Sequence, residues 1–160
     1  MTAIRPARFP ADLEAVRQIF REYADGLGID LAFQDFASEL AQLPGKYAEP
    51  GGRILLAEAD GQILGCVAMR PLQGAACEMK RLYVRPGGRG RHLGRQLATA
   101  ICQAASRAGY RRMRLDTLPG MQAAQRLYLS LGFRPIPAYV FNPVAGTQYM
   151  ELDLSATPPR

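Results

Sequence analysis

Apolar side chains in the first part of the chain recur every three or four positions, which is the period of an α-helix. Residues 2–9 are compatible with a first strand, and residues 10–23 predict a helix that ends before Gly26 and Gly28. The apolar face of this helix consists of Leu13, Val16, Phe20 and Tyr23. A second helix is expected to follow and to stop at Pro44, with an apolar face made of Phe33, Phe36, Leu40 and Leu43.

The centre of the chain changes to patterns typical of strands. Residues 53–59 and 62–69 are apolar runs separated by Asp60 and Gly61, a dipeptide that favours the positive φ of a tight hairpin turn. A third strand, residues 75–84, should end at the proline and paired glycines of residues 86–88, which rule out further sheet pairing. These patterns predict three consecutive strands, the first two of them an antiparallel pair.

Helices and strands alternate in the rest of the chain. The predicted elements are a helix from 93 to a glycine cap at 109, a strand at 111–117, a helix from 119 to 132, a short or bent strand at 133–139 and a final strand at 147–154. The order is therefore β, α, α, β, β, β, α, β, α, β, β. It predicts an α/β fold in which helices pack on the faces of a mixed, mainly antiparallel sheet.

Length and composition favour one domain that comprises residues 1–160. The chain has 160 residues, of which 48% are apolar and 21% charged, and this balance is typical of globular domains. No apolar run is long enough to span a membrane, and the N-terminus lacks the apolar centre of a signal peptide, so we expect a cytoplasmic protein. Cys66, Cys77 and Cys102 have no metal-binding spacing and His92 is the one histidine, so no metal site is expected.

The net charge of +6 favours anionic partners but does not choose among them. Basic residues are dense between Lys80 and Arg95, and Arg111, Arg112 and Arg114 follow within twenty residues. We expect two of these three arginines to share a face with the denser group. This concentration around a glycine-rich turn points to a phosphate site.

The turn itself has the composition of an anion-binding site. Residues 87–94 read Gly-Gly-Arg-Gly-Arg-His-Leu-Gly and lead from a strand directly into a helix, so several backbone N–H groups should converge at the positive end of the helix dipole. The pattern is neither the phosphate-binding loop of nucleoside triphosphatases nor the glycine fingerprint of dinucleotide-binding folds. Taken alone, such a turn could equally be a simple connection between a strand and a helix.

A wider pattern resembles the GNAT family of N-acetyltransferases. It comprises Leu-Tyr-Val-Arg-Pro at 82–86, Arg89-Gly90 with Leu93-Gly94, and Leu-Tyr-x-x-Leu-Gly-Phe at 127–133. The resemblance implies a sheet whose two central parallel strands splay apart, with acetyl-CoA between them as the cosubstrate. The residues that it implies for binding acetyl-CoA are Leu82, Tyr83, Val84, Arg89, Gly90, Arg91, His92, Leu93, Gly94 and Arg95. The pyrophosphate would lie on the turn from 89 to 94, and backbone N–H groups of 82–84 would hold the thioester carbonyl.

The same resemblance implies two catalytic side chains for acetyl transfer to a primary amine. Tyr128 matches the tyrosine that protonates the departing thiolate, and the alternative is that it only packs against the apolar face of its helix. Glu78 matches a glutamate that some members use as the base. Its pKa, normally about 4.3, is about 6 units below that of an amine, so burial would have to raise it or the site would have to lower the pKa of the amine. The alternative is a carboxylate that binds substrate or forms a salt bridge with Lys80 or Arg81.

Two residues depart from the family pattern, and several questions stay open. His92 stands where a glycine is usual, so its imidazole either crowds the pyrophosphate or points outward, and Met121 replaces a common asparagine. They motivate one alternative, a non-catalytic acyl-CoA sensor. The net charge motivates another, a nucleic-acid-binding module, which lacks any recognised motif. Cys77 as a nucleophile would have no histidine nearby to activate it.

The acceptor amine, a small molecule or a peptide, is not identified by the sequence, which also allows a homodimer. Side chains that could line the acceptor pocket are Tyr23, Tyr47, Tyr139 and Asn142.

Overall fold

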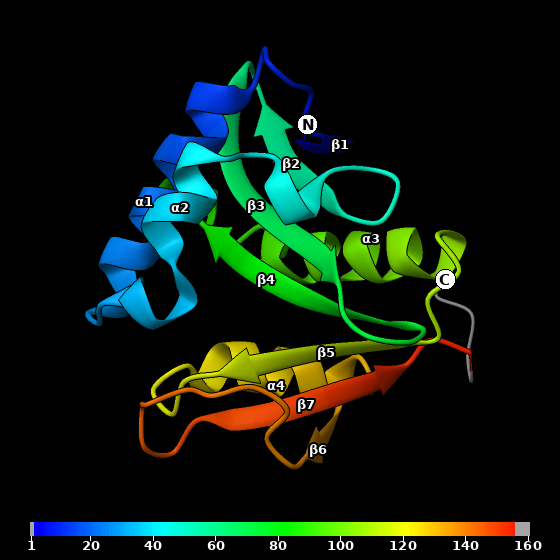
Figure 1. Cartoon of the computed structure of the whole chain (residues 1–160). Coiled ribbons are helices and arrows are strands. Elements are labelled where there is room, and N and C mark those ends of the chain that lie inside the picture. The colour runs from blue at the N-terminus through cyan, green and yellow to red at the C-terminus, as the bar shows by residue number, and fades with distance from the viewer. Residues whose placement is uncertain (1, 156–160) are drawn as a thin grey trace.

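A mixed sheet of seven strands runs through the molecule in the order β1-β2-β3-β4-β5-β7-β6 (Figure 1). It is seen in a computed structural model that describes residues 2–155, apart from the side chain of Phe33. The strands are β1 (Thr2–Pro6), β2 (Arg53–Ala59), β3 (Gln62–Pro71), β4 (Ala76–Val84), β5 (Arg112–Thr117), β6 (Arg134–Ile136) and β7 (Gln148–Asp153). Every pair of neighbours is antiparallel except β4 and β5, so the predicted mixed, mainly antiparallel sheet is confirmed.

Helices cover both faces of this sheet. They are α1 (Leu13–Leu27), α2 (Phe36–Ala41), α3 (Leu93–Arg107) and α4 (Gln122–Ser130), with short 3-10 segments at Leu31–Gln34, Gly45–Tyr47 and Pro86–Gly88. α1 and α2 lie on one face, and α3 and α4 lie on the other (Figure 1). The face under α1 and α2 buries one apolar cluster, and the face under α3 and α4 buries a larger one. No helix within residues 2–155 has the length and apolar character needed to cross a membrane.

The second predicted helix is broken in the structure. In its place lie the 3-10 segment Leu31–Gln34 and the six-residue α2, separated by Asp35 in a left-handed conformation with φ of 55°. The Asp30 carboxylate accepts a hydrogen bond from the Ala32 backbone N–H at 2.9 Å and so fixes the start of the 3-10 segment. The apolar period alone does not reveal this break. The predicted position of the Phe33 side chain lies outside the described part of the structure.

β4 and β5 separate soon after they meet. The two strands pair only from Ala76 to Glu78 and from Arg112 to Arg114. Beyond this point β4 stays paired with β3 as far as Val84, whereas β5 stays paired with β7 as far as Thr117. The strands therefore diverge in a V, as the resemblance implied (Figure 1).

Candidate active site

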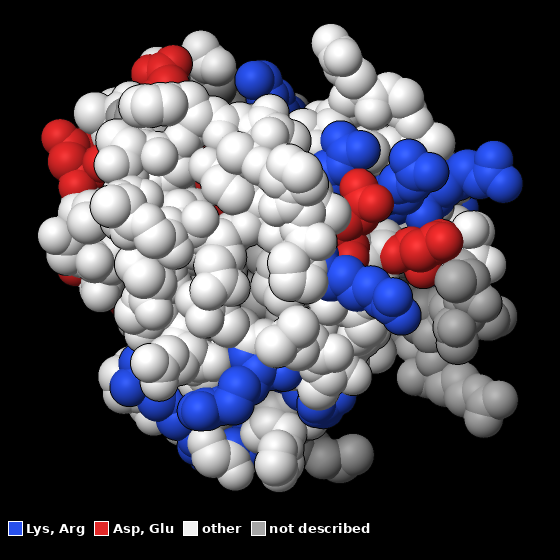
Figure 2. All heavy atoms as spheres, turned by 90° about the horizontal axis from the view of Figure 1, so that it is seen from below, with Lys and Arg blue, Asp and Glu red and all other residues white. Residues whose placement is uncertain are grey.

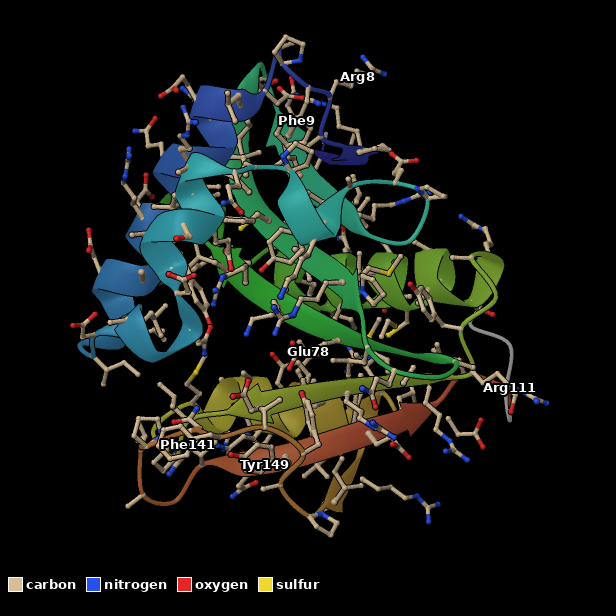
Figure 3. The ribbon with its side chains drawn as sticks, viewed as in Figure 1. Arg8, Phe9, Glu78, Arg111, Phe141 and Tyr149 are labelled. Atoms are coloured by element: carbon tan, nitrogen blue, oxygen red, sulfur yellow. The ribbon has the colours of Figure 1, made fainter. Side chains whose placement is uncertain are left out.

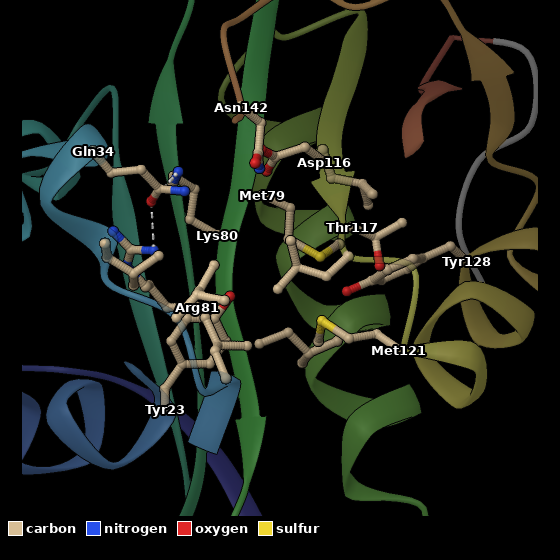
Figure 4. Close-up of a pocket in the computed structure, with 16 residues that line it drawn as sticks. Tyr23, Gln34, Met79, Lys80, Arg81, Asp116, Thr117, Met121, Tyr128 and Asn142 are labelled. Carbon is tan, nitrogen blue, oxygen red and sulfur yellow. Dashed lines mark hydrogen bonds between the residues drawn. The ribbon is translucent and has the colours of Figure 1, made fainter. Parts of the chain in front are cut away.

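A cleft opens where β4 and β5 diverge. It encloses about 560 Å³ of empty space, part of it open to solvent. The lining comes from the end of α1, the loop after it, both strands, α4 and the loop between β6 and β7. The polar and aromatic side chains of the lining are Tyr23, Gln34, Lys80, Arg81, Asp116, Thr117, Tyr128 and Asn142 (Figure 4).

A β-bulge in β4 shapes one wall of this cleft. The register between β3 and β4 shifts between Cys66 and Ala68, and Arg81 adopts a positive φ of 63° at this point. Successive residues of a regular strand face opposite sides of the sheet, but a bulge can place two in a row on one side. Lys80 and Arg81 both donate hydrogen bonds to Oε1 of Gln34, at 3.0 and 2.9 Å. The bulge thus gathers two cations on the wall that faces α1 and α2.

Arg81 ties α2 to the sheet. Its guanidinium donates to both carboxylate oxygens of Glu39, at 2.9 and 2.8 Å, and its side chain is 1% exposed. The rings of Tyr23 and Phe36 lie 5.6 and 5.1 Å from the guanidinium carbon. A bidentate ion pair with two aromatic contacts leaves this cation little freedom to bind a ligand.

Glu78 is buried in a network of ion pairs at the start of the V (Figure 3). Its Oε1 accepts from Nε of Arg70 at 2.8 Å and lies 4.0 Å from Nζ of Lys80, and its Oε2 accepts from the hydroxyl of Tyr139 at 2.6 Å. Burial alone would raise the pKa of Glu78, but these three partners lower it below its usual value. The carboxylate is therefore ionised at neutral pH and does not line the cleft. Glu78 therefore forms a salt bridge, as the alternative to a catalytic role proposed, but its main partner is Arg70 rather than Lys80 or Arg81.

Asp116 supplies the one carboxylate among the residues that line the cleft. Its Oδ2 accepts from the amide nitrogen of Asn142 at 3.1 Å, and Oδ1 of Asn142 accepts from the backbone N–H of Val144 at 3.0 Å. The second bond fixes which end of the amide faces Asp116. Oδ1 of Asp116 has no hydrogen bond within the described residues, so it is available to a ligand.

Tyr128 reaches the cleft from α4. Tyr128 is 6% exposed, and the centre of its ring lies 5.7 Å from the centre of the Phe133 ring. The hydroxyl points into the cleft and makes no hydrogen bond to a described residue (Figure 4). Burial raises its pKa, so the phenol is protonated at neutral pH. Thr117, on the same lining, carries a buried hydroxyl that also lacks a partner among the described residues.

The glycine-rich turn lies beyond the end of β4 and is mostly exposed. Gly90 and His92 have positive φ values of 82° and 58°, and α3 begins at the next residue, Leu93. Arg89, Arg91 and His92 are exposed, so the imidazole lies on the outer surface of the turn. Of the two expectations for His92, this geometry supports an imidazole that points outward over one that crowds the pyrophosphate.

The remaining predicted contacts of acetyl-CoA are placed in different ways. Leu82 lines the cleft, whereas Tyr83 packs its ring 6.3 Å from that of Tyr23 and Val84 packs beside the larger apolar cluster. Leu93 is 2% exposed with its side chain in that cluster, so only its backbone is available. Gly94 is partly buried and Arg95 is exposed, and the Arg95 guanidinium donates to the hydroxyl of Ser130 in α4.

The basic residues do not form one surface, which corrects the prediction from their spacing. Arg112 pairs with Ala76 at the start of β4, at the end of the strand opposite to the turn. Arg85 is also occupied, because it binds both carboxylate oxygens of Glu22 at 2.8 Å. Seen from below, Lys and Arg atoms gather mainly in two groups, one of them interleaved with Asp and Glu atoms (Figure 2). The prediction failed because β5 runs parallel to β4, so the first residues of β5 lie level with the start of β4 and far from the turn that follows its end.

The other predicted residues fall inside and outside the cleft. Tyr23 and Asn142 line it, whereas Tyr47 lies beside a separate hollow next to α2 and Tyr139 binds Glu78. The Cys77 thiol is fully buried and burial raises its pKa to about 12, so it is not a reactive nucleophile at neutral pH. Residues 2–155 contain no group of three or more side chains suited to hold a metal ion.

Several cleft residues were not predicted as site residues. The sequence did not single out Asp116 or Gln34, and Lys80 and Arg81 were considered only as partners of Glu78 and as members of the basic group near the turn. One signal was present, because Glu78, Lys80 and Arg81 are charged residues within a strand that is otherwise apolar. No sequence signal shows that a residue of a 3-10 segment, Gln34, would meet that strand.

The cleft and turn fit an elongated thioester such as acetyl-CoA. Beyond Glu78, the edge of β4 that faces β5 has no pairing with that strand, so its backbone groups are free to bind an extended ligand. Where this edge ends, the chain enters the exposed turn and the N-terminus of α3, which suit a phosphate. Binding groups for an extended arm and for a pyrophosphate therefore follow one another along one segment.

Comparisons with known proteins agree with this architecture. An uncharacterized N-acetyltransferase of Schizosaccharomyces pombe is 43% identical over 155 residues, which cover 96% of this chain and 95% of that protein. A GNAT acetyltransferase structure from Staphylococcus aureus superposes with a TM-score of 0.80 at 19% identity, covering 96% of this chain and 99% of the other.

A putative acetyltransferase from Salmonella typhimurium, solved with its cofactor acetyl-CoA, superposes with a TM-score of 0.67 at 24% identity, covering 99% and 98% of the two chains. At this identity the two structures show the same fold. The profile of the acetyltransferase (GNAT) family matches residues 13–133. The chain therefore belongs to the GNAT family and is an N-acetyltransferase.

Proposed function

We propose that this domain, as one unit, transfers the acetyl group of acetyl-CoA directly to a primary amine in the cleft between β4 and β5. The observation that supports the proposal most strongly is the separation of these two parallel strands after Glu78 and Arg114, with the Tyr128 hydroxyl pointing into the opening. A splayed parallel pair leaves one strand edge unpaired, and such an edge can bind an extended ligand through its backbone.

The donor would be held mainly by backbone groups. Acetyl-CoA supplies an activated acyl group as a thioester. N–H groups of Leu82 to Val84 would hold the thioester carbonyl and stabilise the negative charge that develops on its oxygen. The turn from Arg89 to Gly94 would bind the pyrophosphate through the N-terminus of α3, with the exposed Arg89 and Arg91 adding positive charge.

For the base, the surroundings of the two carboxylates favour Asp116 over Glu78. The sequence proposes Glu78, but its lowered pKa makes it a weaker base and its oxygens already bind Arg70 and Tyr139. Asp116 lines the cleft with one oxygen free of hydrogen bonds to described residues. We propose that Asp116 receives the proton of the attacking amine, directly or through water. We propose that Glu78 instead holds its own partners, Arg70 and Tyr139, in position.

For the acid, we propose Tyr128. An ammonium acceptor loses one proton before attack, and the nitrogen loses a second as the C–N bond forms and the thioester C–S bond breaks. Tyr128 donates a proton to the departing thiolate and is reprotonated by one of the two protons that the nitrogen loses. The other proton passes to solvent, so one proton ends on the thiol and one in solvent. A buried phenol is uphill as a donor to a thiolate whose thiol has a pKa of about 8.5, so local electrostatics in the cleft must favour the transfer.

Calorimetric titration with acetyl-CoA, combined with a thiol-release assay over a panel of primary amines, tests the proposal. We expect binding of acetyl-CoA and release of CoA that depends on the amine. Binding without release for any amine would instead support the non-catalytic sensor. Retention on polynucleotide that weakens with salt, without either result, would support the nucleic-acid-binding alternative.

A further inference from the structure

Three charged side chains line the cleft: Lys80, Arg81 and Asp116. They are not equally available to a ligand. Arg81 is neutralised by its bidentate ion pair with Glu39, in which both carboxylate oxygens lie within 2.9 Å of the guanidinium. The ligand-binding character of this end of the cleft therefore depends on Lys80 and Asp116.

Lys80 is a buried cation with unused donors. Its side chain is 6% exposed, and within the described residues its ammonium makes one hydrogen bond, to Oε1 of the neutral Gln34 at 3.0 Å. The nearest carboxylate oxygen, on Glu78, lies at 4.0 Å, beyond hydrogen-bond distance, and is already bound by Arg70 at 2.8 Å. An ammonium has three N–H donors, so the cleft contains a positive charge that can still bind an anion.

Asp116 faces the same end of the cleft from β5 (Figure 4). One of its oxygens is held by Asn142, and the other is free of hydrogen bonds to described residues. Burial lowers the pKa of Lys80, and the negative charges of Glu78 and Asp116 partly oppose this effect. The two open groups, a cation on β4 and a carboxylate on β5, line the same cleft, so one small molecule in it can meet both.

We propose that the acceptor is an α-amino acid, with its carboxylate bound to Lys80 and its amino group held at Asp116. This proposal rests on the proposed function of the cleft and narrows it to one class of amine. An α-amino acid carries an ammonium and a carboxylate on the same carbon, and the cleft presents one complementary charge from each of its strands. Both open groups are satisfied by one ligand.

Other amines match this arrangement less well. A polyamine or a lysine side chain brings positive charge and no carboxylate, so the buried ammonium of Lys80 would stay without an anionic partner and would repel a second cation. An amino acid amide keeps the amine and the side chain but loses the negative charge. It therefore isolates the contribution of the carboxylate.

The first experiment compares matched acceptors with the intact wild-type protein and acetyl-CoA at saturation. The probes are L-leucine, L-serine and L-phenylalanine, each with its carboxamide and its decarboxylated amine. We expect kcat/KM for CoA release to be at least about 10-fold higher for the acids, as for a hydrogen bond to a charged group. The amine of the carboxamides is less basic, so without recognition of the carboxylate the carboxamides would react as fast or faster, and that result would overturn the proposal.

The second experiment assigns the preference to Lys80. The chain has one other lysine, the exposed Lys46, so Lys46→Met is the matched control for Lys80→Met. We expect Lys80→Met to bring the ratio of acid to carboxamide close to one, and Lys46→Met to keep the wild-type ratio. An unchanged ratio in Lys80→Met would overturn the assignment.

A binding measurement separates this inference from the chemistry. Titration of L-leucine into protein saturated with CoA should show binding that Lys80→Met weakens at least about 10-fold. Acetylation of decarboxylated amines and acids at equal rates would overturn the inference and leave the proposed function intact. Absence of acetylation for every amine, despite binding of acetyl-CoA, would overturn the proposed function itself.

Discussion

The two ends of the cleft are built by different means. At the turn end, residues 82–94 form one continuous segment that offers backbone groups, a helix N-terminus and exposed arginines. At the opposite end, Gln34, Lys80, Asp116 and Asn142 come from four separate parts of the chain and meet through side chains. The first end needs a local backbone shape, and the second needs the tertiary fold.

This difference explains how each end responds to change. Backbone groups are unaffected by most side-chain substitutions, so the turn should tolerate them unless they alter its φ angles. Buried charges depend on their partners, because removal of one partner leaves the other desolvated and unpaired. We therefore expect substitutions to have large effects at the side-chain end and small effects at the turn.

The largest effect should come from Asp116. If this carboxylate is the base, Asp116→Asn lowers kcat by about 1000-fold, within the range for general acid–base catalysis, and leaves the affinity for acetyl-CoA unchanged. Glu78→Gln is the matched comparison, since it removes the carboxylate proposed from the sequence. A greater loss of kcat in Glu78→Gln than in Asp116→Asn would restore Glu78 as the base.

Loss of the ion pair between α2 and β4 should destabilise the fold. Glu39→Gln leaves the buried Arg81 without a countercharge, and we expect it to lower the free energy of unfolding by about 3 kcal/mol in denaturant titrations. The control is Glu14→Gln, which breaks an exposed pair with Arg17 and should cost less than about 0.5 kcal/mol. Equal effects of the two variants would show that burial of Arg81 has little energetic importance.

Tyr128 connects the two ends, and its removal should have a smaller effect than that of Asp116. We expect Tyr128→Phe to lower kcat by about 100-fold with little change in KM, because water can protonate the thiolate less efficiently. Tyr110→Phe is the control, since that hydroxyl donates to the carbonyl of Gly51, outside the cleft lining. A Tyr128→Phe enzyme with wild-type kcat would leave Tyr128 with a packing role only.

The pKa of Glu78 should appear in the pH dependence of stability. Because its folded pKa is lowered, Glu78 contributes stability above its unfolded pKa of about 4.3, and this contribution is lost as the pH falls through the folded value. The difference in unfolding free energy between wild type and Glu78→Gln should therefore shrink below about pH 4.3. A difference that grew on acidification would mean that the folded pKa is raised.

The smallest effect should come from His92, although it is the main departure from the family pattern at the turn. Its side chain is exposed, so His92→Gly should change the KM for acetyl-CoA by less than about twofold, within about 0.5 kcal/mol. Gly90→Ala is the contrast, because an alanine at a φ of 82° strains the backbone although nothing lies within 4 Å of its Cβ. A larger effect of His92→Gly than of Gly90→Ala would contradict a turn that binds through its backbone.

The two ends also differ in how far the sequence predicts them. The hairpin of β2 and β3, the strand before the turn and the helix that opens at Leu93 follow from local periods and turn residues. The turn was predicted for the same reason, since glycines and a helix start are local features. The Lys80 side chain could not be placed, because a bulge changes which face each residue takes and the sequence does not mark it.

Long-range partners account for the other differences. The pairing of Arg85 with Glu22, 63 residues apart, and of Tyr139 with Glu78, 61 residues apart, arises only when the sheet is assembled. The spacing of Lys80 through Arg95 suggested one phosphate-binding cluster, but tertiary partners occupy Arg81 and Arg85. Local composition therefore identifies the binding turn, and tertiary contacts decide which charges remain free.

Amide hydrogen exchange with and without acetyl-CoA is the most direct test that the cleft between β4 and β5 is the site of transfer. The account predicts slower exchange on binding for the backbone N–H groups of Leu82 to Val84 and of Arg89 to Gly94, because these groups bind the donor. Another hollow, at the other end of the two strands, is lined by residues that include Ala76, Arg111, Arg112 and Arg114. Slower exchange confined to that hollow, with none along residues 82–94, would contradict the account.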